Sequence, residues 1–174
     1  TLARTVWDDH NRYLATYFSD FPCRYATHDE AVVDFDGHLW VLGRADDVIN
    51  VAAHRISTME IEAVVTAHPG VVEAAVVGVP HETKGTVPVA FVTLGHDVAL
   101  EDVREDIKRR VVDELGGYAQ LDRVYLTESM PKTRTGKTMR RLLRDFVVHG
   151  KPTGDTSAVE DLSALDVVAN AVRE

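Results

Sequence analysis

Residues 72–94 decide the fold, and they read VEAAVVGVPHETKGTVPVAFVTL. Two apolar runs, 72–79 and 87–94, flank a polar turn at 80–85 that contains proline and glycine. The length of each run and its content of β-branched residues are typical of strands in a buried sheet. The segment therefore predicts two strands that lie side by side in the core of a domain.

Helical patterns surround these two strands, and a third strand follows them. Upstream, Ser57 or Thr58 can cap a helix that a His-Pro-Gly sequence then ends. Downstream, apolar residues at helical spacing over 100–115 predict a second helix, and 122–127 is typical of a third strand. A last core helix is expected from Met139 onward. We therefore expect an α+β fold, a small domain with a central three-stranded sheet flanked by helices.

The first 43 residues show a different pattern. Residues 31–41 contain two short apolar runs around Asp36-Gly37, and these two residue types tolerate the positive φ of tight hairpin turns. Because one isolated hairpin is marginally stable in water, we expect this β-hairpin to pack on a larger domain upstream. We interpret the start at Thr1, which is not a methionine, as a cut rather than a natural terminus.

Changes of pattern along the chain suggest three parts. Residues 1–43 are expected to be the end of a large N-terminal domain, and residues 44–149 a small C-terminal domain. Residues 150–174 are expected to form a linker and a tail helix. Ser157 followed by Glu160 has the spacing of a capping box, which predicts where that helix begins.

Composition excludes several classes of protein. The formal net charge of -9 argues against a nucleic-acid binder, because binding of that kind depends on clustered Lys and Arg. The single Cys23 excludes an internal disulfide and a thiolate zinc site, and it suits the cytoplasm. The eight histidines show no paired metal-ligand spacing, so no metal site is predicted. No apolar run approaches the about 18 residues that span a bilayer, so we expect no membrane segment.

The most informative chemical segment is 131–138, with the sequence PKTRTGKT. A glycine-containing basic turn that opens onto a helix offers exposed amides and a lysine charge to a phosphate or carboxylate. A P-loop would need another glycine five residues before Gly136, where this chain has Pro131. A solvated basic turn is the plain alternative.

Two longer segments resemble one known family. Residues 130–144, MPKTRTGKTMRRLLR, are similar to the last signature of the AMP-forming acyl-CoA synthetases, and residues 43–58, GRADDVINVAAHRIST, are similar to their hinge motif. The residues of these two motifs resemble those of acetyl-CoA and propionyl-CoA synthetases within the adenylate-forming superfamily, which also contains peptide-synthetase adenylation domains and luciferases. The resemblance implies that this chain is the C-terminal portion of such an enzyme.

The resemblance implies roles for three residues in these motifs. Lys137 matches the catalytic lysine, whose ammonium offsets charge that builds up as a carboxylate attacks the α-phosphate. Arg44 matches an arginine that hydrogen-bonds the nucleotide ribose. Asp46 matches the hinge about which the small, mobile domain rotates between the two half-reactions.

The resemblance also implies nucleotide and CoA contacts. Asp29 matches the carboxylate that takes both ribose hydroxyls, and Arg55 matches an arginine that meets a phosphate of the nucleotide or of CoA. Ala52 and Ala53 lie where the pantetheine arm of CoA passes the backbone. The family commonly has glycine at Ala53, and an added methyl group narrows that passage or forbids a positive φ.

The reaction that this resemblance implies joins a short carboxylate to CoA. MgATP and the acid give an acyl-adenylate and pyrophosphate, and the CoA thiol then gives acyl-CoA and AMP. The resemblance implies ATP and Mg²⁺, held mainly by the large N-terminal adenylation domain, with CoA as co-substrate. We expect the fragment alone to be inactive. We also expect acetylation of Lys137, by an acetyltransferase and a deacetylase, to stop adenylation.

Two rival interpretations stay open on sequence. One is another adenylate-forming ligase, such as a peptide-synthetase adenylation domain or a luciferase-like ligase. The other is a non-catalytic binding module that keeps the fold, which Ala53 favours and an intact Lys137 disfavours.

Overall fold

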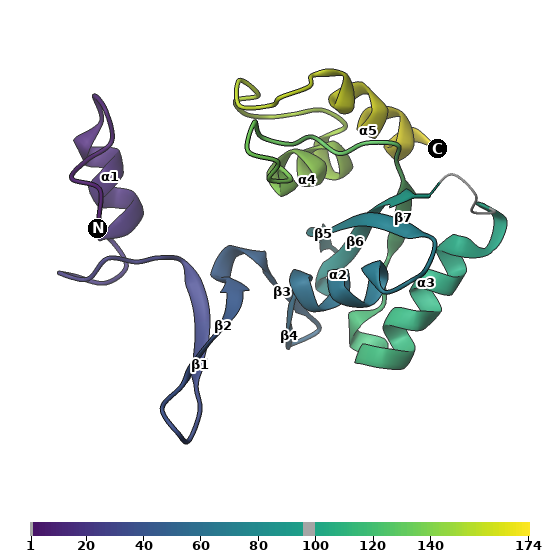
Figure 1. Ribbon diagram of the computed structural model, residues 1–174, viewed down its shortest axis with the longest axis horizontal. Coiled ribbons are helices and arrows are strands. Elements are labelled where there is room, and N and C mark those ends of the chain that lie inside the picture. Colours follow the sequence, from purple (N-terminus) through teal and green to yellow (C-terminus); the bar gives the residue numbers. More distant parts are fainter. Residues whose placement is uncertain (1, 96–99) are drawn as a thin grey trace. The chain divides into compact units, whose positions relative to one another are not determined.

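The computed structural model describes residues 2–95 and 100–174, and Figure 1 shows the order of their helices and strands. The chain divides into two compact units, Thr1–Asp46 and Asp47–Glu174.

The first unit contains one helix and one hairpin. Helix α1, His10–Tyr17, is capped at its N-terminus by Asp9, whose side chain accepts a hydrogen bond from the backbone N–H of Arg12 at 2.9 Å. Strand β1, Asp29–Val33, pairs antiparallel with β2, Leu39–Arg44, as the sequence predicts.

The hairpin loop is longer than the tight two-residue turn that Asp36-Gly37 suggested. It spans the five residues between Val33 and Leu39, and of those five only Gly37 has a positive φ, at 85°. Asp34 closes this loop, because its carboxylate accepts hydrogen bonds from the backbone N–H of His38 at 2.8 Å and from Trp40 Nε1 at 2.8 Å. The loop is therefore fixed by a side chain as well as by its glycine.

The second unit is built on one five-stranded sheet with the order β4-β3-β6-β5, in which β7 also pairs with β6. The three predicted strands are confirmed: β5 and β6 form a long antiparallel pair, and β7 lies parallel to β6. Sequence reasoning missed the β3–β4 hairpin, which extends the sheet beyond three strands. The bounds are Val48–Val51 for β3, His54–Ser57 for β4, Val71–His81 for β5, Gly85–Leu94 for β6 and Arg123–Leu126 for β7.

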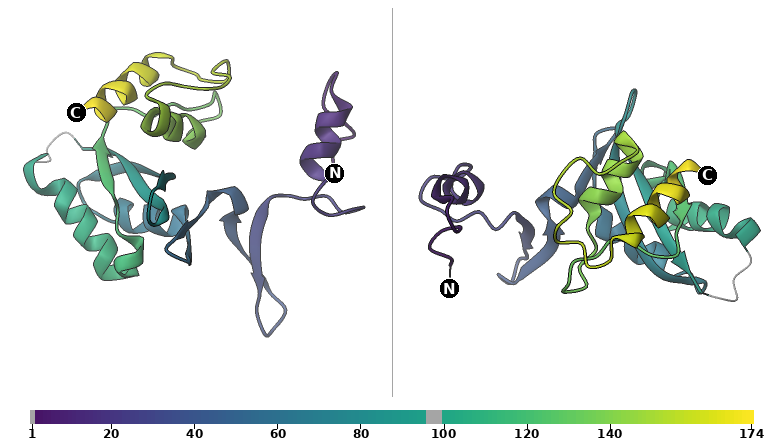
Figure 2. Two further views of the ribbon diagram at one scale, coloured as in Figure 1. Left: turned by 180° about the vertical axis from the view of Figure 1, so that it is seen from behind. Right: turned by 90° about the horizontal axis from the view of Figure 1, so that it is seen from above.

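Helices cover both faces of this sheet (Figures 1 and 2). On one face, α2 and α3 pack Ile61 and Ile107 against Val76 in one core cluster. On the other face, α4 and α5 pack Leu143 and Val168 into a second cluster. Successive residues of a strand point to opposite faces, so β5 contributes to both clusters. The bounds are Thr58–Thr66 for α2, Leu100–Leu115 for α3, Arg140–His149 for α4 and Ser163–Arg173 for α5.

The tail helix begins later than the predicted capping box. Helix α5 starts at Ser163, whose backbone N–H and hydroxyl both bond the Asp161 carboxylate, at 2.9 and 2.7 Å. Ser157 lies six residues earlier, in a turn, and donates to Asp155. The backbone N–H of Glu160 donates instead to the carbonyl of Lys132, at 2.9 Å. The Ser157 pattern therefore marked a turn that holds the tail to a distant loop.

Candidate functional site

Lys137 lies in a narrow loop, which we call the Lys137 loop and define as residues 132–138. A β-bridge between Lys132 and Thr138 closes the loop. Inside it, Thr133 N–H donates to the Lys137 carbonyl at 2.9 Å, and Lys137 N–H donates to Thr133 Oγ1 at 3.2 Å. Gly136 has a φ of 80°, a conformation that glycine adopts without strain. The loop backbone is therefore well fixed by local hydrogen bonds.

The Lys137 side chain is exposed at this loop. Within the part of the chain that the structure describes, its ammonium makes no hydrogen bond or ion pair. The basic turn does not open directly onto a helix, as the sequence suggested, because α4 begins three residues later, at Arg140. Lys137 is thus a point charge on a fixed loop rather than part of a helix N-terminus.

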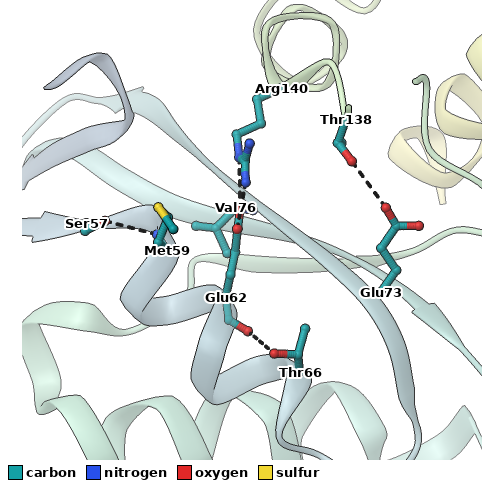
Figure 3. A network of polar contacts seen from close by, with 8 residues as sticks. All are labelled: Ser57, Met59, Glu62, Thr66, Glu73, Val76, Thr138 and Arg140. Atoms are coloured by element: carbon teal, nitrogen blue, oxygen red, sulfur yellow. Dashed lines mark hydrogen bonds and ion pairs between the residues drawn. The ribbon is translucent and has the colours of Figure 1, made fainter. Parts of the chain in front are cut away.

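The ends of the loop are tied to the sheet by Glu73 of β5. Its carboxylate accepts from Lys132 Nζ at 2.7 Å and from Thr138 Oγ1 at 3.2 Å, and Figure 3 shows the second of these contacts. Sequence reasoning missed Glu73. It is separated from these partners by 59 and 65 residues, so no local pattern marks it.

A second acidic residue, Glu62, holds the chain just after the Lys137 loop, at Arg140. Arg140 forms a two-pronged pair with Glu62 of α2, with Nε–Oε1 at 3.0 Å and Nη2–Oε2 at 2.7 Å (Figure 3). Glu62 also accepts from the backbone N–H of Val76 at 2.8 Å, which satisfies a backbone donor of β5. Hydrogen bonding to Glu62 raises the pKa of the Arg140 guanidinium, against burial that lowers it. Two-pronged charged hydrogen bonds of this kind fix direction as well as distance.

The tail also holds the Lys137 loop. Thr133 forms a β-bridge with Val159, which is buried. Asp145 of α4 anchors the start of the tail, because its buried carboxylate accepts from the backbone N–H and the hydroxyl of Thr153, at 3.0 and 2.9 Å. The loop that carries Lys137 is therefore supported from the sheet and from the tail.

The predicted CoA-side residues form the tip of the β3–β4 hairpin. Val51 pairs with His54, so Ala52 and Ala53 form a two-residue turn in which both φ values are positive, 46° and 72°. Turns of this kind favour Asn and Gly, because other side chains pay a steric cost for positive φ. The alanine methyl at residue 53 therefore does not forbid the positive φ, but it strains the backbone.

Two neighbours support this hairpin tip. His54 stacks on Tyr118, which lies in a 3₁₀ helix, Gly117–Ala119, with ring centroids 4.7 Å apart and an interplanar angle of 21°. The backbone N–H of Ala52 donates to the Lys84 carbonyl of the β5–β6 turn at 3.2 Å. Arg55 follows on β4, exposed to solvent and paired in register with Asn50.

The predicted nucleotide residues of the first unit lie next to each other. Asp29 and Arg44 are partners in the β1–β2 register, and Arg44 Nη1 lies 3.6 Å from Asp29 Oδ1. Arg44 Nη1 also donates to the Thr27 carbonyl at 2.8 Å. Both side chains are about two-fifths exposed.

The structure separates the other predicted residues. The Lys137 loop is tied to β5, one edge of the sheet, whereas Ala53 and Arg55 lie on the β3–β4 hairpin at the opposite edge. Asp46 belongs to a 3₁₀ helix, Ala45–Asp47, but its side chain lies outside the described part of the structure. The second unit thus carries two separate candidate surfaces on one rigid sheet.

Other concave or acidic features do not include these residues. A cavity of about 540 Å³ is lined by the ends of β6 and β7 and by α5. Ligand atoms of Asp34, Asp36 and His38 lie within 4.8 Å of one another, but Asp34 is already used to close its hairpin loop. Among the described helices, none has both the length and the apolar character needed to cross a bilayer.

The sequence is similar to those of known proteins. The family described as AMP-binding enzyme C-terminal domain matches residues 60–137. Acetyl-coenzyme A synthetase from Rhodopirellula baltica is 47% identical over 167 residues, which are 94% of this chain and 24% of the relative. The chain spans about a quarter of the length of the curated relatives it matches.

Solved structures show the same fold. An ATP-bound RpMatB-BxBclM chimera superposes on 84% of this chain and 29% of its own, with a TM-score of 0.71 and 28% identity. Amide bond synthetase McbA from Marinactinospora thermotolerans covers 82% of this chain and 28% of its own, with a TM-score of 0.67 and 31% identity. Residues 60–137 therefore form an AMP-binding enzyme C-terminal domain, and the chain is similar in sequence to the acetyl-CoA synthetases and in fold to adenylate-forming enzymes.

Proposed function

We propose that this chain is the C-terminal part of an AMP-forming short-chain acyl-CoA synthetase, an acid-thiol ligase. In that enzyme it supplies the adenylation lysine and the CoA-side hairpin. The observation that carries the proposal is the exposed Lys137 on a loop tied at both ends, in a chain 47% identical to an acetyl-CoA synthetase.

In the first half-reaction, the Lys137 ammonium stabilises negative charge on the α-phosphate. As the carboxylate oxygen attacks the α-phosphorus of ATP and pyrophosphate leaves, negative charge increases on the oxygens of that phosphate. A lysine ammonium at a fixed position stabilises this charge in the transition state more than in the ground state. Because Lys137 has no partner among the described residues, no existing ion pair must break before it meets the substrates.

Asp29 and Arg44 hold the nucleotide in this proposal. The Asp29 carboxylate accepts hydrogen bonds from the ribose hydroxyls, and the Arg44 guanidinium donates to the ribose oxygens. Their proximity, 3.6 Å, supports a shared ligand, since a sugar can bridge two groups at that separation.

Magnesium belongs to the large adenylation domain in this scheme. The carboxylates that support the Lys137 loop, Glu62 and Glu73, already accept from Arg140, Lys132 and Thr138. They are therefore not arranged to hold Mg²⁺.

In the second half-reaction the small domain turns and presents the other sheet edge. The boundary between the two compact units falls between Asp46 and Asp47, which supports Asp46 as the hinge. Ala52 and Ala53 then line the path of the pantetheine arm, and Arg55 meets a phosphate of CoA or of the nucleotide. One rotation exchanges the Lys137 loop for the hairpin, because the two lie at opposite edges of the sheet.

Exposed residues on the β1–β2 hairpin and at Lys137 suggest the remaining protein partners. Phe35 is fully exposed on the β1–β2 hairpin, and Trp40 is 61% exposed there, so we propose that the large domain covers this hairpin in the cytoplasmic enzyme. We also propose that an acetyltransferase and a deacetylase regulate the exposed Lys137, because acetylation removes its charge. Full adenylation activity of a protein stoichiometrically acetylated at Lys137 would refute the regulatory proposal.

A second candidate is an adenylate-forming ligase with a different acceptor. The strained turn at Ala52-Ala53 favours it, since a methyl group stands where CoA would pass, and an amide bond synthetase shares this fold. The two candidates differ in the second half-reaction: a CoA ligase consumes acyl-adenylate with CoA, whereas an amide ligase consumes it with an amine. Loss of adenylation altogether would favour the non-catalytic module.

The test uses the full-length protein and measures carboxylate-dependent pyrophosphate exchange. We expect Lys137→Ala to reduce exchange by at least about a hundredfold and Lys137→Arg to restore little, because the guanidinium is longer and planar. Lys151→Ala removes an exposed lysine charge elsewhere and should leave exchange unchanged. Normal exchange by Lys137→Ala would refute the proposed function.

A further inference from the structure

One carboxylate contacts both ends of the Lys137 loop. Glu73 accepts from Lys132 Nζ at 2.7 Å and from Thr138 Oγ1 at 3.2 Å, and these two residues are partners in the bridge that closes the loop. The contacts use different oxygens, Oε2 for Lys132 and Oε1 for Thr138. Glu73 therefore fixes the rotation of the loop base as well as its distance from the sheet.

The position of Glu73 on β5 explains why it can do this. Along the strand, Glu73, Ala75 and Val77 alternate with Val76, and Ala75 and Val77 pack into the cluster under α4 and α5. Residues two apart in a strand share a face, so Glu73 lies on the face that α4 covers. The register of β5 against β6 is irregular between Val71 and Glu73, at the end of this pairing. The carboxylate thus stands on a strand that is paired with β6, beside the start of the loop.

We call the contacts of Glu73 with Lys132 and Thr138 the clamp. Its partial burial limits how much it contributes to the stability of the fold. The Glu73 side chain is 29% exposed and that of Lys132 is 37% exposed, so solvent screens the ion pair. Screening limits its contribution to folding, but it does not remove the directional constraint of two hydrogen bonds on one carboxylate. We therefore expect the clamp to affect geometry more than stability.

The Lys137 ammonium depends on this geometry. Within the described residues its side chain has no partner of its own, so the loop backbone alone determines where it starts. Catalysis by a positioned charge is sensitive to placement, and a shift of about 1 Å can reduce a rate by about a hundredfold.

We propose that Glu73 is a positioning residue for Lys137, acting through Lys132 and Thr138 without touching substrate. This inference rests on the proposed function and deepens it, because it names what holds the adenylation lysine in place. It separates the two half-reactions: Glu73 serves adenylation, at one edge of the sheet, and not the hairpin at the other edge.

The experiment compares Glu73→Gln with Lys137→Ala in the full-length protein. For Glu73→Gln we expect kcat of pyrophosphate exchange to fall between about ten- and a hundredfold, with KM for ATP and carboxylate changed less than about threefold. Thioester formation from supplied acyl-adenylate and the thermal midpoint should stay as in the parent. Glu105→Gln is the matched control, because it removes an acid–lysine ion pair of 3.1 Å on α3.

A double-mutant cycle tests the route. If Glu73 acts through the loop base, Thr138→Val and Glu73→Gln together should reduce kcat by less than the product of the two single reductions. Independent, multiplicative effects would overturn the proposed route.

The outcomes separate the two claims. Normal exchange by Glu73→Gln, with exchange lost in Lys137→Ala, overturns the positioning role and leaves the proposed function standing. Equal losses in both half-reactions by Glu73→Gln show a general structural role and also overturn it. Normal exchange by Lys137→Ala refutes the proposed function itself.

Discussion

At the scale of single residues, Ala53 has a backbone conformation that is unusual for alanine. It holds a φ of 72° in a two-residue turn where glycine would carry no steric cost. The neighbouring Ala52 has a φ of 46°, so two alanines share the strain of one turn. The turn persists because β3 and β4 pair on both sides of it.

The strain predicts whether replacing Ala53 with glycine raises or lowers the free energy of unfolding. Ala53→Gly should raise the free energy of unfolding by up to about 1 kcal/mol, because relief of the positive-φ cost exceeds the added freedom of the unfolded chain. Ala63→Gly, inside α2, is the same chemical change at an ordinary helical position and should lower it by about 1 kcal/mol. Urea unfolding of both variants measures the pair. Equal signs would contradict the assigned turn geometry.

Glu62 is a polar residue whose loss should lower the free energy of unfolding. Its side chain is 13% exposed, and it satisfies both Arg140 and the backbone N–H of Val76. Glu62→Ala leaves a half-buried guanidinium and a backbone donor without their acceptor, so we expect a loss of roughly 2 kcal/mol in the free energy of unfolding. Glu60→Ala is an exposed control on the same helix and should change it by less than about 0.5 kcal/mol.

At the scale of elements, the loop of the β1–β2 hairpin is held by a titratable carboxylate, that of Asp34. The Trp40 indole bond, followed by the backbone N–H of His38, lowers the pKa of Asp34 below its ordinary value of 3.8. A carboxyl group with a lowered folded pKa adds stability that is present above its unfolded pKa and is lost as pH falls through the folded pKa. Acid should therefore loosen this loop only as the pH falls below 3.8.

An NMR titration of the indole N–H signals checks this prediction. The Trp40 signal should shift with a midpoint below pH 3.8, whereas Trp7, which is 94% exposed, serves as the internal reference. In Asp34→Asn the Trp40 shift should disappear. A Trp40 midpoint at or above 3.8 would show that the carboxylate is not held as described.

Local patterns predicted the elements that are long and regular. The runs on either side of the 80–85 turn became β5 and β6, and Ser57 caps α2 through Met59 N–H at 3.2 Å. The β3–β4 hairpin was not predicted as two paired strands, because its turn is Ala52-Ala53 and contains no glycine or asparagine to signal it. Ser157 misled because a serine near an acid stabilises turns as readily as helix starts.

The candidate site was predictable only in part, for a related reason. Lys137 and Arg55 stand within motifs that a sequence displays directly. Glu62 and Glu73 act across 78 and 59 residues, on Arg140 and Lys132, and no periodicity joins such partners. They could be found only once the sheet had brought α2 and β5 beside the loop.

At the scale of the whole molecule, one sheet carries two candidate surfaces at opposite edges. The Lys137 loop is fixed to β5, and the strained hairpin of β3 and β4 carries Arg55 at the other edge. The chain spans about a quarter of its curated relatives, so both surfaces await the rest of the enzyme in the proposed scheme. In the proposed scheme, one small domain therefore serves two reactions by turning, rather than by refolding.

The most direct test of that account is a double dissociation in the full-length protein, with pyrophosphate exchange and thioester formation from supplied acyl-adenylate measured separately. The account predicts that Lys137→Ala abolishes exchange and spares thioester formation, and that Arg55→Ala reduces thioester formation by at least about tenfold while exchange changes less. If each variant impaired both half-reactions equally, the assignment of the two sheet edges to two separate steps would be wrong.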